Sequence, residues 1–450
     1  MSANARKRKL NRDGSKSPVT SDRKSIKVKQ SSMATFLTTP SRKVQEKIVW
    51  QARGPGGSLP NSLLVGTYLP SGDQTIATKK FRNKIAAFDL DSTLIKTKSG
   101  KVHASNAQDW NWWHPSVPEK LKKLYLDDNF SIAIISNQAG LSLKSDSTPK
   151  SKLSLFKTKV SDVLGNLNFP ITIYVATEKD VYRKPRTGMW LELLKDYEID
   201  ECKETLNLKE CFYVGDAAGR KSWEGRPKDF ACSDRNFAEN IGIKFATPEE
   251  YFLGEKQRSF LRSFEPSKYV QDSETKVPEV FARINKQDIV LLCGSPGAGK
   301  SSWYWRNLEP LGYFRINQDI LKTREKCIQV ASQNISKGKS VAIDNTNADV
   351  EVRAKWVELS NKHEVPIRCV HLMTPTEICI HNDTVRALND AMNPEKRTIL
   401  PGIAFNGYNK KFQPPKIDEG YQDITEIPFK LDMKFYGSAA EKSIWSQHWV

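Results

Sequence analysis

The sequence predicts an α/β protein made of two doubly wound parallel-sheet domains. Its 450 residues exceed the limit of about 250 to 300 residues for a single hydrophobic core, so two domains are expected. Short apolar segments alternate with helical stretches in two successive regions, which favours parallel strands joined by crossover helices. Functional side chains of such folds gather at the carboxyl ends of the strands. The expected strands are 85–88, 131–135, 171–175 and 211–214, then 288–293, 313–316, 340–343 and 367–372.

The composition along the chain predicts the order of its parts. We expect a disordered basic tail over residues 1–43, a first domain over 44–254, a charged linker over 255–286 and a second domain over 287–450. The tail is rich in Ser, Lys, Arg and Thr and nearly lacks large apolar residues. Burial of apolar surface therefore cannot offset the entropy of ordering the tail.

Two short segments of the tail carry signals for partners. Residues Arg6–Lys9 form a basic cluster of the kind that nuclear import receptors bind, which predicts a nuclear location; a solvated tail that touches DNA is the alternative. Residues Gln30–Leu37 place Met33 and Phe36 on one face of a helical turn. This segment resembles the short plug with which repair proteins dock on the sliding clamp, and a chance apolar patch is the competing interpretation.

Charge, hydropathy and cysteine content narrow the class of protein. The formal net charge of +18 and the isoelectric point near 9.4 attract polyanions, although a basic tail on an ordinary surface would give the same total. The amino terminus lacks a secretory signal and the apolar runs are too short to span a bilayer, so no membrane association is expected. Seven scattered cysteines without metal-ligand spacing predict reduced thiols.

Acidic side chains follow the first expected strand. Asp89 and Asp91 point to one side, because alternate residues of an extended segment share a face. Two carboxylates this close suit a divalent cation and phosphate chemistry, although a solvated turn, a calcium loop or a transferase metal site would have the same pattern. Later strand ends add Ser136 as a hydrogen-bond donor to a phosphoryl oxygen, Lys184 to neutralise charge and Asp216 as a metal ligand.

This order of residues resembles the haloacid dehalogenase superfamily of phosphatases. The resemblance implies that Asp89 attacks phosphorus and becomes an aspartyl-phosphate. Asp91 would protonate the departing oxygen and then activate water. It further implies that Mg²⁺ is held by Asp89, Asp216 and the main-chain carbonyl of Asp91. The superfamily often has glycine where Ser92 stands, and serine is small enough for such a turn.

A glycine-rich phosphate loop follows the expected strand at 288–293. The glycines let backbone amides face the β- and γ-phosphates of a nucleotide, Lys300 bridges these phosphates and Ser301 binds Mg²⁺. The loop predicts ATP binding, but by itself it does not separate a kinase from an ATPase or a GTPase. Its residues are Gly294, Ser295, Pro296, Gly297, Ala298, Gly299, Lys300, Ser301 and Ser302.

Two further acidic residues follow strands of the second region. Asp319 comes directly after the strand at 313–316, where its carboxylate could take a proton from an attacking hydroxyl; a helix N-cap is the alternative role. Asp344 closes the strand at 340–343 and could hold the water shell of magnesium or an active-site basic residue.

Longer segments, over nearly everything from residue 44 to 431, resemble the polynucleotide kinase 3′-phosphatase family. The resemblance implies that Arg386 on a lid helix contacts the transferred phosphoryl group and that Asp234 either supports the metal ligands or caps a helix. Family members often carry Arg where this chain has Gln318 and Thr384, which leaves the identity of the lid arginine, and any role of Arg397, open. The segments are Val214–Arg220, Lys228–Arg235, Phe245–Glu250, His381–Arg386, Phe412–Pro415 and Glu426–Phe429.

Animal relatives of that family also carry a forkhead-associated domain, and none is expected here because residues 1–43 are too short and too polar to form one. The resemblance implies a bifunctional DNA end-repair enzyme that removes a 3′-phosphate and phosphorylates a 5′-hydroxyl at strand breaks with ATP and Mg²⁺. DNA ends are the expected partner and a monomer the expected state. The alternatives are an RNA end-healing enzyme, a phosphatase with a degenerate kinase, and an inactive end-binding scaffold.

Overall fold

The computed structural model describes residues 48–56, 59–70, 82–144, 151–199, 206–269, 281–431 and 439–450. The expected tail over 1–43, with its basic cluster and its clamp-like segment Gln30–Leu37, lies outside these residues, as does Cys202. The other six cysteines are free thiols, and five of them are buried. Within the described ranges, no helix has the length and apolar content that crossing a bilayer requires.

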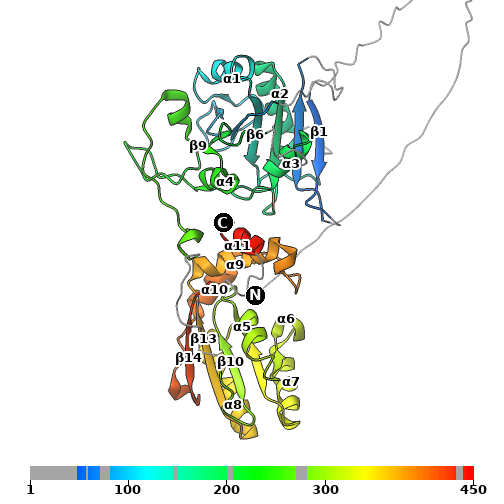
Figure 1. Cartoon of the computed structure of the whole chain (residues 1–450), viewed down its shortest axis with the longest axis vertical. Coiled ribbons are helices and arrows are strands. Elements are labelled where there is room, and N and C mark those ends of the chain that lie inside the picture. Colours follow the sequence, from blue (N-terminus) through cyan, green and yellow to red (C-terminus); the bar gives the residue numbers. More distant parts are fainter. Residues whose placement is uncertain are drawn as a thin grey trace, which may run out of the picture. The chain divides into compact units, whose positions relative to one another are not determined.

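The first domain is built on a seven-stranded sheet with the order β1-β2-β7-β6-β3-β8-β9 (Figure 1). The strands from β7 to β9 are parallel, whereas β1 and β2 extend the β7 edge in antiparallel orientation. The strands predicted in this region are present, and β1, β2 and β9 are additional to them. The bounds are β1 (Ile48–Arg53), β2 (Leu63–Tyr68), β3 (Ile85–Phe88), β6 (Ser131–Asn137), β7 (Ile171–Ala176), β8 (Phe212–Val214) and β9 (Lys244–Ala246).

Helices cover both faces of this sheet. α1 and α2 pack on the face that presents Ile134, while α3 and α4 pack on the face that presents Ile135. Because neighbouring strand residues point to opposite faces, a strand covered on both sides is apolar nearly throughout. The doubly wound arrangement predicted from the sequence is therefore confirmed. The helices are α1 (Val117–Leu126), α2 (Lys152–Leu167), α3 (Gly188–Asp196) and α4 (Ser233–Ile241), and the smaller elements are β4 (Ile95–Lys96), β5 (Asn111–Trp112), η2 (Glu249–Leu253) and η3 (Pro266–Tyr269).

The second domain has a five-stranded sheet with the order β11-β12-β10-β13-β14, in which all strands are parallel. The central strand β10 (Ile289–Cys293) is buried along its whole length, and it delivers the phosphate loop at its carboxyl end. The predicted strands are again present, and β14 is additional. The other bounds are β11 (Phe314–Ile316), β12 (Val341–Asp344), β13 (Ile367–Met373) and β14 (Ile424–Pro428).

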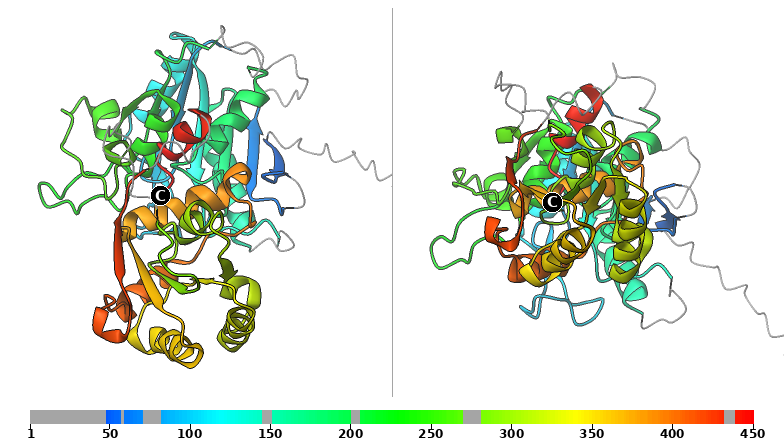
Figure 2. Two further views of the ribbon diagram at one scale, coloured as in Figure 1. Left: turned by 60° about the horizontal axis from the view of Figure 1, so that its bottom comes forward. Right: turned by 90° about the horizontal axis from the view of Figure 1, so that it is seen from below.

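Helices also cover both faces of the second sheet. α7 and α8 lie side by side against the face that presents Leu291, and α5, α9 and α10 pack on the face that presents Leu292 (Figures 1 and 2). The loops after β10, β11 and β12 thus meet at one edge of the sheet. The bounds are α5 (Lys300–Asn307), α6 (Gln318–Leu321), α7 (Arg324–Ser336), α8 (Val350–His363), α9 (Thr376–Leu388), η4 (Asp390–Met392), α10 (Gly402–Lys411), η5 (Ile417–Glu419) and α11 (Ala439–Trp445).

Candidate active sites

Asp89 and Asp91 lie in a tight turn directly after β3. The backbone N–H of Asp89 donates to the carbonyl of Val214 on the neighbouring β8 (2.9 Å), which fixes the start of the turn. Ser92 has a φ of 61°, in the left-handed region that glycine adopts most readily. A serine there costs about 1 to 2 kcal/mol, which gives a physical reason for the glycine that the resembled superfamily often has at this point.

The ammonium group of Lys184 lies at the centre of a buried hydrogen-bond cluster. Its Nζ shares its three N–H groups among four acceptors, Asp89 Oδ1 (2.7 Å), Asp234 Oδ1 (2.8 Å), Ile135 O (2.9 Å) and the Tyr213 hydroxyl oxygen (2.6 Å). Burial acts to lower the pKa of Lys184, but the charges of Asp234 and Asp89 more than offset it, so the pKa is raised overall. Lys184 therefore stays charged where the strands end.

A trio of carboxylates, Asp89, Asp216 and Asp234, surrounds the same space, with one oxygen of each lying within 4.8 Å of the others. Burial raises the pKa of Asp89 to about 7 against the opposing charge of Lys184. Burial, with the charges of Asp234 and Asp89, also raises the pKa of Asp216 well above its usual range. Because three carboxylates face one lysine, the trio has an excess of negative charge and suits a divalent cation with oxygen ligands.

The carboxylate of Asp91 points to other partners. It accepts a hydrogen bond from Gln138 Nε2 (2.6 Å) and forms an ion pair with Lys159 Nζ (3.1 Å), and 48% of its side chain is exposed. Gln138 Nε2 also donates to Ser136 Oγ (3.1 Å), so Gln138 joins Asp91 to Ser136. Sequence reasoning missed Gln138, which the two-residue period beyond Ser136 would have found, and Lys159, for which no local signal exists.

The position of Asp234 decides between the two roles expected for it, support of the metal ligands and capping of a helix. Cys232 is the N-cap residue of α4, and Asp234 lies in the first turn, where its Oδ2 accepts the N–H of Ala217 (3.0 Å). Asp234 therefore does not cap this helix, and its other oxygen is free to pair with Lys184. Metal contact by the main-chain carbonyl of Asp91 stays a prediction.

The predicted phosphate loop joins β10 to the first turn of α5. Gly297 has a φ of 75°, and a Cβ on it would lie 2.2 Å from the carbonyl oxygen of Cys379 on α9. Only glycine fits there. Lys300 Nζ donates to the carbonyls of Gly294 (2.8 Å) and Ser295 (2.7 Å), and burial lowers the pKa of Lys300. The lysine is thus held at the mouth of the loop.

A second acidic centre lies beside this loop. Ser301 Oγ donates to Asp344 Oδ2 (2.7 Å), and Arg315 Nη2 forms an ion pair with the same oxygen (2.6 Å). Asp344 is 2% exposed, and its buried Oδ1 has no hydrogen-bond partner among the residues that the structure describes. A buried carboxylate oxygen that lacks a partner, next to a hydroxyl, suits a hydrated cation.

Asp319 lies in α6, at the end of β11. The side chain of Asn317 accepts the Asp319 N–H (2.9 Å), so Asn317 and not Asp319 caps this helix. The Asp319 side chain is 72% exposed, and its Oδ2 lies 3.3 Å from Arg397 Nη2. Arg397 pairs with Glu395 (2.6 Å), which in turn pairs with Arg315 (2.6 Å). Alternating charges therefore connect Asp319 to the acidic centre, and sequence reasoning missed Glu395 and Arg315.

Arg386 and Arg397 have different surroundings. Arg386 Nη2 pairs with Asp383 Oδ1 (2.5 Å) on the same helix, α9, and burial lowers the pKa of Arg386. The other oxygen of Asp383 accepts the N–H of Leu400 (2.8 Å), which anchors the segment between α9 and α10. Arg397 belongs to that segment and is the one that contacts Asp319. The predicted contact of Arg386 with a phosphoryl group stays a prediction.

The fold and the two sites together define a two-domain enzyme of phosphoryl transfer, with a carboxylate-based site on one sheet and a phosphate loop on the other. Residues 84–252 match the family described as polynucleotide kinase 3 phosphatase, and residues 289–415 match an AAA domain. Among solved structures, the APS kinase of Mycobacterium tuberculosis covers 34% of this chain and 96% of its own, at 17% identity and a TM-score of 0.24.

Relatives similar over most of the chain establish the family. A protein of Schizosaccharomyces pombe, named bifunctional polynucleotide phosphatase/kinase, is 43% identical over 377 residues, which cover 83% of this chain and 84% of the relative. A polynucleotide 3′-phosphatase of Saccharomyces cerevisiae is 31% identical over 235 residues, which cover 42% of this chain and 94% of the relative. The chain belongs to the family of bifunctional polynucleotide phosphatase/kinases.

Proposed function

We propose that this protein is a DNA end-processing enzyme that removes a 3′-phosphate with its first domain and phosphorylates a 5′-hydroxyl with its second. The observation that carries the proposal is that one chain contains both a lysine-centred carboxylate cluster and a phosphate loop with acidic residues beside it. The Lys184-centred carboxylate cluster is suited to hydrolysis, and the phosphate loop with Asp319 is suited to transfer. The net charge of +18 suits a polyanionic substrate, and the basic cluster in the tail supports a nuclear location.

The phosphatase step follows from the orientation of Asp89. Lys184 holds Oδ1, and among the described residues no hydrogen bond engages Oδ2, so Oδ2 is the attacking atom. As the bond from Oδ2 to phosphorus forms, the bond from phosphorus to the 3′-oxygen breaks, and Asp91 donates a proton to that oxygen. Asp91 then takes a proton from water, whose oxygen attacks the aspartyl-phosphate and releases inorganic phosphate and free Asp89. Lys184 and Ser136 stabilise the charge on the phosphoryl oxygens.

The kinase step uses the second site. Asp319 accepts the proton of the 5′-hydroxyl, whose oxygen attacks the γ-phosphorus of ATP while the bond to the β-phosphate oxygen breaks and ADP leaves. Lys300 and the amides of the phosphate loop hold the β- and γ-phosphates. Arg397, which contacts Asp319 in this structure, is near enough to the acceptor side to meet the transferred group.

Both sites have donor sets that fit Mg²⁺. In the first, Asp89 and Asp216 would hold the ion, and in the second Ser301 would hold it, with Asp344 holding its water shell. When bound, Mg²⁺ supplies positive charge that neutralises phosphate oxygens and polarises the phosphorus centre. The excess of carboxylate in the first site and the unpaired Oδ1 of Asp344 in the second support this assignment.

To test this proposal, the protein is incubated with ATP, Mg²⁺ and an oligodeoxynucleotide that has a 5′-hydroxyl and a 3′-phosphate. The phosphorylation state of both ends of the product is then measured. Asp89→Asn should abolish loss of the 3′-phosphate and leave the kinase intact, whereas Lys300→Ala should do the converse. A matched RNA strand tests the choice of DNA, since faster processing of RNA would reverse it. If the wild-type chain leaves both ends of the DNA strand and of the RNA strand unchanged, the proposal is wrong. It is also wrong if either substitution abolishes both activities.

A further inference from the structure

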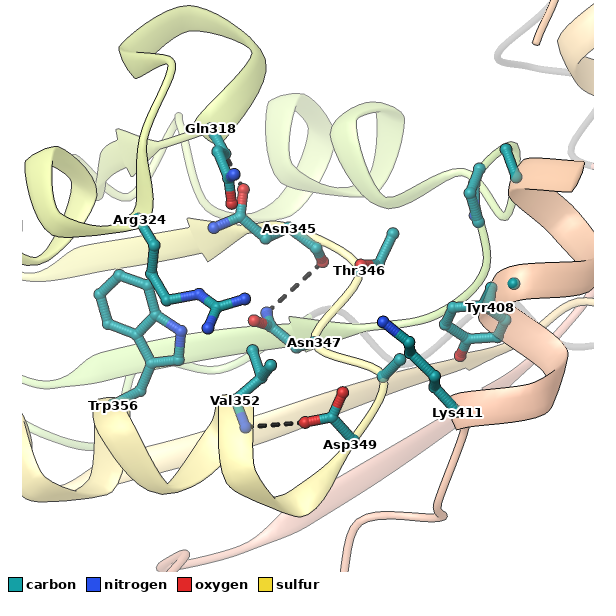
Figure 3. A pocket seen from close by; sticks show the side chains of 14 residues that line it. Gln318, Arg324, Asn345, Thr346, Asn347, Asp349, Val352, Trp356, Tyr408 and Lys411 are labelled. Carbon is teal, nitrogen blue, oxygen red and sulfur yellow. Dashed lines mark hydrogen bonds between the residues drawn. The ribbon is translucent and has the colours of Figure 1, made fainter. Parts of the chain in front are cut away.

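The phosphate loop of the second domain borders a cavity of about 270 Å³, so side-chain packing encloses the loop only in part. Figure 3 shows this cavity with lining side chains from α8 and α10, and Pro296 of the loop forms part of its wall. Hydrogen bonds from α9 and from the residues just before it hold two carbonyls of the loop. Gly297 O accepts Asn382 Nδ2 (3.0 Å), and Ala298 O accepts Thr374 Oγ1 (3.0 Å).

These two hydrogen bonds fix the direction of peptide units in the loop. In a trans peptide the N–H points away from the carbonyl oxygen of the same unit. The donors that hold Gly297 O and Ala298 O therefore also determine where the N–H groups of the following residues point. A phosphate loop binds a nucleotide through backbone N–H groups. The amide of Asn382 can thus act on nucleotide binding through the conformation of the loop.

The Asn382 side chain is itself held by α11. Its Oδ1 accepts the indole N–H of Trp445 (2.8 Å), and Trp445 is 0% exposed in an apolar cluster with Ile378 and Val385 of α9. An indole N–H can only donate and a carbonyl oxygen can only accept. The amide of Asn382 satisfies both partners in one orientation alone, with its oxygen towards Trp445 and its NH₂ group towards Gly297.

The main chain of α11 is anchored at the same point. His381 Nε2 lies 2.8 Å from the carbonyl oxygen of Trp445, and because this oxygen can only accept, Nε2 carries the proton. Burial lowers the pKa of His381 to about 4, so the ring stays neutral near pH 7. Trp445 therefore contacts the neighbouring residues His381 and Asn382 through its main chain and its side chain, respectively.

We propose that Trp445 and Asn382 are positioning residues for the nucleotide: Trp445 orients the amide of Asn382, and Asn382 holds the phosphate loop in the conformation that binds a triphosphate. This inference rests on the proposed function, because it concerns the nucleotide site of the kinase step. Without the indole N–H, the amide is free to turn, and a smaller fraction of molecules has the competent loop. The apparent Kd for the nucleotide rises as that fraction falls. A bound nucleotide orders the loop itself, so kcat at saturating ATP is preserved.

The test measures the Kd of a non-hydrolysable ATP analogue with Mg²⁺ by isothermal titration of the full chain. Trp445→Phe keeps an aromatic ring in the cluster and removes the indole N–H. We expect this variant to raise Kd about tenfold, which corresponds to about 1.4 kcal/mol, and to raise KM for ATP by a similar factor at unchanged kcat. KM for the 5′-hydroxyl strand and the 3′-phosphatase rate should stay within about twofold of wild type.

A double-mutant cycle tests whether Trp445 acts through Asn382. Asn382→Leu has a similar volume and removes both contacts of the amide, so it should raise Kd at least as much as Trp445→Phe. The double variant should have the Kd of Asn382→Leu alone, because residues that act through one another are not additive. Separate contributions to stability would instead make the two effects on Kd add.

Trp449→Phe is the matched control, because Trp449 Nε1 donates to Ile444 O (2.7 Å) within the same terminal segment and Trp449 lies in the same apolar cluster. It should leave Kd within about twofold of wild type. The assignment is wrong if Trp445→Phe keeps the wild-type Kd, if its effect adds to that of Asn382→Leu, or if Trp449→Phe has the same effect. If the wild-type chain binds the analogue but phosphorylates no 5′-hydroxyl strand, the proposed function fails instead, and the Kd values still decide on Asn382.

Discussion

Replacing Lys184 by methionine tests the charge balance of the first site directly. Methionine has nearly the same length as the lysine stem but carries no charge. Among the described residues, Lys184 is the cation that contacts both Asp89 and Asp234, and the change removes it. The two ion pairs measure 2.7 and 2.8 Å, and the Lys184 and Asp234 side chains are 2% and 3% exposed. Water cannot reach these groups to screen the loss.

The magnitude follows from that burial. Removing one partner of a buried ion pair costs about 3 to 5 kcal/mol, because an uncompensated charge stays behind. A domain of about 210 residues loses about 2 to 4 °C of Tm per kcal/mol, so we expect the Tm of the phosphatase domain to fall by about 6 to 20 °C. Protonation of Asp89 or Asp216 removes part of the uncompensated charge, so the decrease in Tm should be smaller at pH 5.5 than at pH 8.

The sign of that pH dependence follows from linkage. Burial already raises the pKa of Asp89 from 3.8 in a free carboxyl to about 7. A group whose folded pKa is raised contributes stability that is present below its unfolded pKa and is lost as pH rises through the folded pKa. Without Lys184, the charge that opposes the rise in the pKa of Asp89 is gone, so Asp89 stays protonated up to higher pH. The variant therefore loses stability most strongly between neutral and alkaline pH. Mg²⁺ should restore part of the stability, because it replaces the missing positive charge.

The assay is scanning calorimetry of the full chain at pH 5.5 and pH 8, with and without Mg²⁺. The unfolding transition of the kinase domain is identified by the increase of its Tm when an ATP analogue is added. The other transition reports the unfolding of the phosphatase domain. Lys195→Met is the control, because Lys195 is 59% exposed in its ion pair and such pairs contribute at most about 1 kcal/mol. Equal Tm values for the Lys184 variant and wild type at pH 8, or a larger loss at pH 5.5 than at pH 8, would refute this account of the charge balance.

Two further predictions concern the kinase domain. Arg397→Gln should lower the kcat of the kinase by a factor of about 10² to 10³. Arg386→Gln should lower kcat less, because Arg386 is paired with a carboxylate of its own helix. If steady-state rates show the reverse order, Arg386 is the residue that contacts the phosphoryl group. Gly297→Ala should abolish ATP binding in isothermal titration, because its Cβ would lie 2.2 Å from the carbonyl of Cys379. The control is Gly338→Ala, because Gly338 also has a positive φ, but no atom of the described residues lies within 4 Å of the added Cβ. This variant should bind ATP normally, and equal affinity of both variants would contradict the steric argument.

The central strands and the phosphate loop could be predicted from the sequence because their signals are local. A strand buried on both faces is apolar throughout, and glycines at fixed spacing define the loop. The edge strand β1 gives no such signal, since its residues alternate irregularly between exposed and buried and its place depends on pairing with β2. The same limit applies to Lys159 and Glu395, which reach the sites from the middle of a helix and from an irregular segment. Only tertiary packing brings them there.

The two sites balance charge in opposite ways, and this difference has a consequence for how each accepts a phosphate. The first site has more carboxylate than ammonium and needs a cation before an anion can approach. In the second, the ion pairs run Asp319, Arg397, Glu395, Arg315 and Asp344, with alternating sign. Each arginine there is already engaged by two carboxylates, so a triphosphate must compete with these carboxylates for them. In the proposed kinase step, an arginine released from Asp319 in that competition would be available to the phosphoryl group and would leave the Asp319 carboxylate unpaired. Nucleotide binding would then prepare the proposed base for the 5′-hydroxyl.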